Sequence, residues 1–136
     1  ALSCQVCHAV QYKNCYGCHV QKSDDGVPFY KIEPSVMAFK IGRNPIQSED
    51  RPYRYVPVRH VPVARDSFAY YGDDLLPNFD SRPTWAYSTP HTIQKDTPQN
   101  AACNTCHGHA ELFLTADDVD PGELEANRDV IVGEIP

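Results

Sequence analysis

The chain lacks the long apolar segment that a membrane-spanning helix requires. Its 136 residues contain no run approaching the ~20 apolar residues that span a bilayer. It also lacks a basic stripe, because 12 lysine and arginine residues are set against 18 acids, and binding to a phosphate backbone needs clustered positive charge. The sequence therefore argues against a transmembrane helix and against a nucleic-acid partner.

Large aliphatic residues are sparse, and 12 prolines and 7 glycines are spread along the chain. Proline and glycine interrupt long regular elements. Much of the apolar content is Tyr, Phe, Val and Ala, so a core made only of these side chains would be thin. We expect a single domain over residues 1–136, mostly irregular coil with a few short α-helices and minimal strand, in which another group fills the middle.

Four segments carry local structural signals. Residues 51–66 alternate valine and proline, which predicts an extended or polyproline-like conformation. A short helix is expected near residues 111–114. A second helix is expected over residues 121–127, because proline is tolerated in a first helical turn. The apolar residues 130–132 predict a short terminal strand.

The negative charge is concentrated at the end of the chain. Residues 117–136 hold seven acids and one base, Arg128, so this acidic tail alone carries the formal charge of −6. The favoured interpretation is a solvated terminal segment. The alternative is a docking surface for a basic partner.

The six cysteines all fall in three copies of Cys-x-x-Cys-His, beginning at Cys4, Cys15 and Cys103, and none is left over. A zinc site built from the first two cysteine pairs is one interpretation. Disulfides or a redox dithiol are a second. Neither explains the histidine after each second cysteine. Covalent attachment of haem c, for which this motif is the known signature, uses every residue of the pattern.

Haem attachment also explains the spacing. Two thiols add across the two vinyl groups of one porphyrin, and the next residue directs its imidazole at the iron. The predicted attachment residues are Cys4, Cys7, Cys15, Cys18, Cys103 and Cys106, and the predicted proximal iron ligands are His8, His19 and His107.

Three histidines remain, which equals the number of iron positions left to fill. We therefore predict His60, His91 and His109 as distal ligands. Flanking prolines lower the entropy lost when a ligand is fixed, as at His60 and His91. His109 is too close to His107 to reach the same iron, so it would serve a neighbouring haem and bring the third haem beside one of the first two. Met37 is a less favoured ligand, because methionine more often packs.

The haems are expected to lie close together. His8 and His19 are 11 residues apart, at most ~40 Å when fully extended. Adjacent haems with saturated irons relay electrons and leave no position for a substrate. Bis-imidazole ligation is expected to give lower potentials than Met/His ligation. Guanidinium groups suit carboxylates, so arginines are suggested partners of the haem propionates: Arg59, Arg65 and Arg82.

The three motifs and the spare histidines resemble those of multihaem c-type cytochromes. The resemblance is specific over residues 4–19 and 103–109. It is weaker over residues 51–102, where RHVPVARD and PNFDSRPTWAYSTPHTIQKDTPQNAACNTCHG look like the C-terminal part of larger multihaem cytochromes. The chain departs from the small trihaem cytochromes, because 83 residues lie between His19 and Cys103 and the composition is not rich in lysine.

The resemblance implies three haems c that form the core, with little regular secondary structure. It implies export to the periplasm or the cell surface, and redox proteins as partners, including other multihaem cytochromes or copies of this chain. The predicted function is electron transfer rather than catalysis. One alternative is a multihaem reductase with one open haem, in which Arg59 binds an anion. The other is a filament protomer or a subunit of a larger redox complex.

Overall fold

The computed structural model describes residues 2–9, 15–35, 39–61, 71–73, 75–88, 90, 92–102 and 104–136. For residues 15–22, 30–35, 79 and 80 only the backbone is described. The elements in chain order are α1 (Cys4–His8), β1 (Cys15–Lys22), β2 (Pro28–Ser35), β3 (Phe39–Arg43), β4 (Tyr55–His60), α2 (Pro77–Asp80), β5 (Trp85–Tyr87), the 3₁₀ turns η2 (Pro98–Asn100), η3 (Ala110–Leu112), η4 (Ala116–Asp118) and η5 (Pro121–Glu123), and α3 (Leu124–Asn127).

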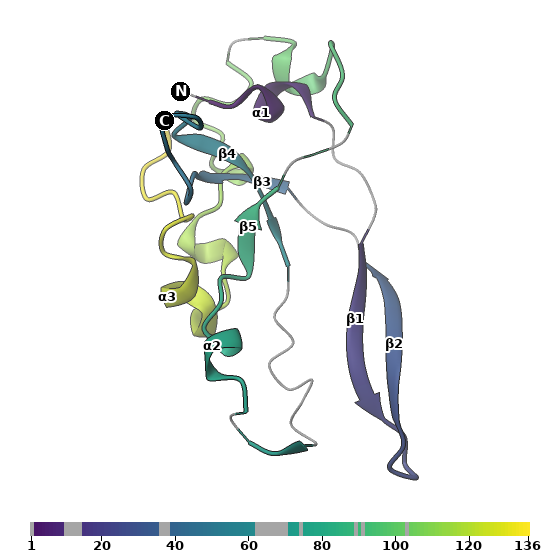
Figure 1. The fold of residues 1–136 in the computed structure, drawn as a ribbon. Helices are drawn as coiled ribbons and strands as arrows, with labels where there is room; N and C mark the ends of the chain where they lie inside the picture. Colours follow the sequence, from purple (N-terminus) through teal and green to yellow (C-terminus); the bar gives the residue numbers. More distant parts are fainter. Residues whose placement is uncertain are drawn as a thin grey trace.

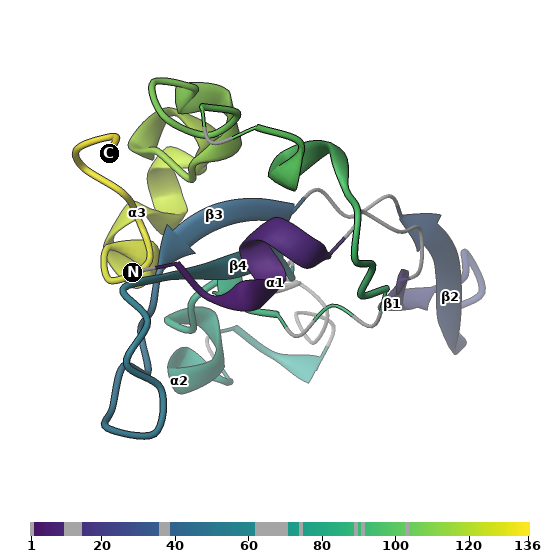
Figure 2. The same ribbon diagram turned by 90° about the horizontal axis from the view of Figure 1, so that it is seen from above.

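The described strands form two antiparallel sheets, one with order β1-β2 and one with order β3-β4-β5 (Figure 1). Figure 2 shows α1 lying across β4, with which it is in contact. The β1–β2 hairpin projects away from the three-stranded sheet in both views. None of the helices in the described residues is long and apolar enough to span a bilayer.

The hairpin is longer than a prediction of minimal strand implies. β1 and β2 have eight residues each and pair along their whole length, from Cys15↔Ser35 to Lys22↔Pro28. The turn between them is tight, and Gly26 adopts a φ of 82°, a conformation that glycine reaches without a Cβ clash. A local turn makes such pairing inexpensive in chain entropy. That haems form the core stays a prediction.

A proline lies inside the central strand β4. Pro57 is opposite Ile41 of β3, and its carbonyl accepts a hydrogen bond from the Ser88 amide at 3.0 Å. In an antiparallel sheet the N–H and C=O of one residue point toward the same neighbouring strand. The N–H that Pro57 lacks would therefore point toward the chain just beyond Tyr87, the last residue of β5. Proline therefore removes one bond at the end of the β4–β5 pairing and none from its middle. The extended conformation predicted for residues 51–66 is confirmed over β4.

The core lies between this sheet and the C-terminal segment. Its buried members are Val56, Val58, Trp85, Leu114, Val119 and Val130. Gly42 permits the close approach, because a Cβ built there would lie 2.7 and 2.8 Å from the two Val58 methyl carbons and 3.0 Å from the Val130 carbonyl oxygen. This cluster is small, as expected from the shortage of large aliphatic residues.

The interpretation of residues 117–136 as a solvated segment is wrong. Val119, Val130 and Val132 are only 5, 3 and 3% exposed. Six of the seven acids in this tail stay exposed, while Glu123 is half-buried. Acidic and apolar residues alternate, so one face of the segment covers the sheet while the other meets water. A docking role for the acidic face stays a prediction.

The local predictions near the C-terminus had mixed outcomes. The helix expected over residues 121–127 is confirmed as η5 followed by α3. The short helix expected near residues 111–114 is instead a 3₁₀ turn over Ala110–Leu112. No strand forms at residues 130–132. Their backbone bonds go to two different partners, since the Val130 carbonyl accepts from Arg43 and the Val132 amide donates to Leu114, each at 2.8 Å.

Candidate haem-attachment site

The first Cys-x-x-Cys-His motif forms α1. Residues three and four apart share one side of a helix, so Cys4, Cys7 and His8 lie together, and the buried Val6 anchors the turn. The preceding Ser3 is extended and its amide donates to the Tyr55 carbonyl at 3.0 Å, which joins the helix to β4. Cys4 is exposed, while Cys7 and His8 are half-buried. The three side chains of this motif therefore gather on one side of α1, and Cys4 is the most exposed of them.

His8 is held through one ring nitrogen. Its Nδ1 lies 3.0 Å from the Gln94 carbonyl oxygen and 3.1 Å from that of Lys95. Within the described residues, all hydrogen bonds of the His8 ring involve Nδ1, so Nε2 is the nitrogen left for a metal. Metal-ligating histidines almost always donate their other N–H to a carbonyl, a carboxylate or water.

The segment that holds His8 comes from far along the chain. The Gln94 amide donates to the His8 carbonyl at 2.8 Å, and the Thr97 hydroxyl donates to the Cys7 carbonyl. The Gln99 amide nitrogen donates to the Ala9 carbonyl at 2.6 Å. These bonds satisfy carbonyls at the C-terminal end of a five-residue helix that would otherwise be unpaired.

The same segment leads into the third motif. The Thr105 hydroxyl donates to the Gln99 carbonyl at 2.6 Å, which places the end of the motif beside α1. Burial raises the pKa of the Cys7 thiol, and the nearby thiols of Cys106 and Cys4 raise it further. The first and third motifs are therefore neighbours, and the Cys7 thiol stays protonated at neutral pH.

Two hollows border these motifs. A cavity of about 340 Å³ has Cys106 in its wall and is otherwise lined mainly by apolar groups, among them Val6, Phe39 and Leu112. A second hollow of about 350 Å³ is lined by Cys4, His8, Gln5, Tyr53 and Ile93. Both volumes are in the range of ligand pockets, roughly 300–1,000 Å³. The second hollow has Cys4 and His8 in its wall, and a thiol beside an imidazole whose Nε2 is left for a metal is part of the donor set that a haem c would need there.

His109 repeats the arrangement of His8 in an exposed position. Its Nδ1 lies 2.8 Å from Glu111 Oε1. The pKa of Glu111 is lowered, first by a hydrogen bond from its own backbone amide and then by the bond from His109. A carboxylate on one ring nitrogen orients the ring and raises the basicity of the other, so Nε2 of His109 suits a metal.

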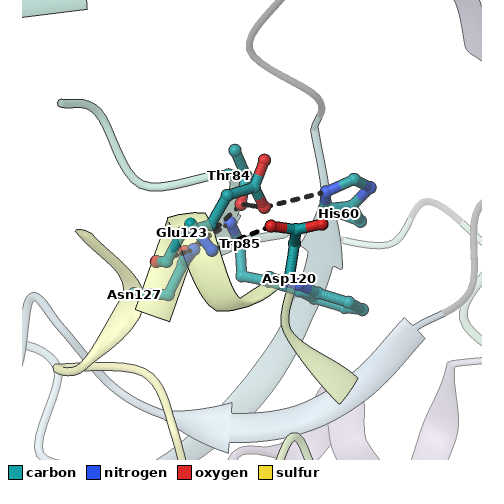
Figure 3. A network of polar contacts seen from close by, with 7 residues as sticks. His60, Thr84, Trp85, Asp120, Glu123 and Asn127 are labelled. Carbon is teal, nitrogen blue, oxygen red and sulfur yellow. Dashed lines mark hydrogen bonds and ion pairs between the residues drawn. The ribbon is translucent and has the colours of Figure 1, made fainter. Parts of the chain in front are cut away.

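His60 lies at the far end of β4 and is engaged differently. Its Nε2 is 3.6 Å from Glu123 Oε2 (Figure 3), and its ring centroid is 5.3 Å from that of Trp85. The Glu123 carboxylate also accepts the Thr84 hydroxyl proton at 2.6 Å. α1 joins β4 at Tyr55, roughly 17 Å from His60 along the strand. The structure thus brings His60 to the C-terminal segment rather than to the first motif.

Asn127 completes this network and was not singled out by the sequence. It is 1% exposed. Its Oδ1 accepts from the Trp85 amide at 2.8 Å, and its Nδ2 donates to Thr84 Oγ1 and to the Glu123 carbonyl at 2.9 Å each. These bonds fix the C-terminal segment to β5. The only local signal was an asparagine within the expected helix.

Several predicted site residues lie outside the described part. They are His91, Cys103, Met37 and Arg65. The second motif lies on β1, where the backbone alone is described for Cys15, Cys18 and His19. His107 and Arg82 are exposed, and Arg59 is a half-buried residue of β4. The roles predicted for these residues as ligands, attachment points or propionate partners stay predictions.

Among the described residues, no group of three His, Cys, Asp or Glu side chains is arranged to hold a metal ion. A zinc site would need the side chains of Cys15 and Cys18, which are outside that set, so this alternative stays open. Comparison of the chain with protein-family models, with curated proteins and with solved structures finds no match. A functional assignment therefore depends on the residues of the chain itself.

Proposed function

We propose that this protein transfers electrons through three covalently bound haems c, one at each Cys-x-x-Cys-His motif. The observation that carries the proposal is the arrangement on α1. Cys4 and Cys7 lie on the same side of α1 as His8, whose Nδ1 is 3.0 and 3.1 Å from two backbone carbonyl oxygens. A disulfide, or a zinc site built from the four cysteines of the first two motifs, would use the thiols but would leave this imidazole without a role.

Each part of the first motif then has a role. The thiols of Cys4 and Cys7 would hold the porphyrin by adding across its two vinyl double bonds to give thioethers, and Nε2 of His8 would hold the iron. Bound haem iron supplies one-electron redox chemistry. The carbonyls of Gln94 and Lys95 fix the ring plane of His8 and increase the electron donation of its Nε2.

Proximity supports relay between haems. Cys106 lines the same cavity as Gln5 and Val6 of α1, so groups attached at the first and third motifs would be neighbours. The second motif follows the first after only six residues, at most ~25 Å of chain. Redox proteins would be the donor and the acceptor, and haem attachment of this type implies an exported protein.

The distal ligands proposed are His60, His91 and His109. Of the two that are described, His109 already presents Nε2, whereas His60 must leave Glu123 to do so. The engagement of His60 favours a second candidate function, in which one iron keeps an exchangeable position and acts on a small substrate. The two functions differ in how they respond to carbon monoxide.

The test is the absorption spectrum of the dithionite-reduced full chain, with the ratio of haem to protein, before and after carbon monoxide. Three haems c and no response support electron relay. A response at one haem supports the second candidate. A chain without haem overturns both candidate functions and favours a zinc site at the cysteines. The double variant Cys4→Ser, Cys7→Ser is expected to lose one of the three haems, and Asn78→Ala, at an exposed position outside the three motifs, is the control.

A further inference from the structure

We propose that Asn100 is a positioning residue for the axial ligand His8, so that it sets the potential of the haem at the first motif. The proposal rests on the function proposed for that motif. Asn100 follows His8 by 92 residues and lies 3.2 Å from its Nδ1 through the side-chain Nδ2. It is part of the turn η2, which packs on α1.

The orientation of the Asn100 amide is fixed by two other bonds. Its Oδ1 accepts from the Thr97 amide at 2.9 Å, and its Nδ2 donates to the Lys95 carbonyl at 2.7 Å. Because the amide oxygen accepts one bond and the amide nitrogen donates the other, the side-chain amide cannot be turned over so that oxygen and nitrogen exchange places. Asn100 thus holds the Lys95 carbonyl in the place where it meets His8.

This arrangement selects one tautomer of His8. Two carbonyl oxygens, of Gln94 and Lys95, surround Nδ1, and a carbonyl can only accept. They favour a proton on Nδ1, which leaves the Nε2 lone pair for iron. The opposite tautomer, in which Nδ1 accepts from Asn100, would place the proton on Nε2 and block the metal. The Asn100 amide nitrogen can only donate, so it is a direct partner of Nδ1 in that opposite tautomer alone. Asn100 supports the tautomer that binds iron through its N–H bond to the Lys95 carbonyl, which holds that acceptor beside Nδ1.

The turn η2 is itself held in place, so Asn100 has a fixed position relative to His8. Thr97 is 6% exposed, and its hydroxyl donates to the Cys7 carbonyl. The carbonyl of Gln99 accepts from Thr105, one residue before Cys106. The ring plane of His8 is therefore set by a segment that also carries the third motif.

The test compares two substitutions of Asn100 in the haem-loaded chain. Asn100→Ala releases the Lys95 carbonyl, so one of the three haems is expected to change its potential and its low-spin EPR signal, with faster exchange of the His8 Nδ1 proton. Asn100→Asp places a carboxylate beside Nδ1, which accepts its proton more strongly and shifts the potential of that haem to a more negative value. The other two haems are expected to keep their potentials.

Gln99→Ala is the matched control. It removes a 2.6 Å bond between the same two elements without touching His8, so it is expected to lower stability and leave all potentials unchanged. Equal shifts of the haem potential in Gln99→Ala and Asn100→Ala would show that Asn100 has only a structural role, and this would overturn the proposal. Unchanged potentials in both Asn100 variants would also overturn it. Haem counts by mass spectrometry separate these results from failure of the proposed function, in which the unmodified chain carries no haem.

Discussion

Replacement of Asn127 by alanine is expected to be among the most destabilising changes that the described residues allow. Its side chain is 1% exposed and makes three hydrogen bonds, one of them from the Trp85 amide. Trp85 is itself buried, at 7% exposure, and no water can replace the lost acceptor without opening the core.

The magnitude follows from these contacts. Leaving one buried N–H without an acceptor costs about 1–3 kcal/mol, and each further bond lost costs about 0.5–1.5 kcal/mol. The total for Asn127→Ala is therefore about 2–6 kcal/mol, a large part of the 5–15 kcal/mol typical of a domain. For a chain of this size such a loss lowers the melting temperature by roughly 7–20 °C.

Urea denaturation of the haem-loaded protein, followed by far-ultraviolet circular dichroism, measures this change. The midpoint is expected to fall while the slope stays constant. Asn78→Ala, at an exposed position of α2, is the control and is expected to change stability by less than about 0.5 kcal/mol. A loss below about 1 kcal/mol for Asn127→Ala would refute the idea that its bonds fix the C-terminal segment.

Three further outcomes are expected. Gly42→Ala forces a Cβ to 2.7 Å from a Val58 methyl carbon, so calorimetry is expected to show a loss of about 1–3 kcal/mol, and unchanged stability would contradict this packing. Burial raises the pKa of Asp118, but its hydrogen bonds, the largest from Lys40, outweigh burial and lower the pKa overall. The ionised Asp118 therefore stabilises the fold fully above its ordinary pKa of 3.8, and this contribution is lost as pH falls through the lowered pKa. Acid titration of Asp118→Asn is expected to lack that loss, and identical acid profiles would count against the pair. His60→Ala is expected to make one haem bind carbon monoxide, and an inert variant would remove His60 from the ligands.

Local sequence signals correctly predicted the features that depend on residues close together in the sequence. A proline at the start of residues 121–127 predicted a helix that forms, and the spacing of the first motif predicted that Cys4, Cys7 and His8 belong together. Both patterns act within one or two turns of chain. The strand expected at residues 130–132 did not form, because its backbone partners come from two distant segments.

The partners of His8 could not be predicted in the same way. Gln94, Lys95 and Asn100 are 86 to 92 residues away, and a polar residue at such a distance leaves no periodic pattern. Thr97 and Asn100 have the spacing of a capping box, which suggests a local turn but not its contact with α1. Burial of Asn127 is similarly a long-range property, since its partner Trp85 lies 42 residues earlier.

The distance between α1 and the segment that holds it has a consequence for biosynthesis. A ribosome that adds roughly 5–20 residues per second needs roughly 4–18 s to make the 86–92 residues between His8 and its partners. During that interval the residues that pair with α1 are still missing, and a helix of five residues is too short to be stable alone. The first motif is thus translated before the segment that surrounds it in the fold, and its thiols are most accessible to a modifying enzyme before that segment has closed on them.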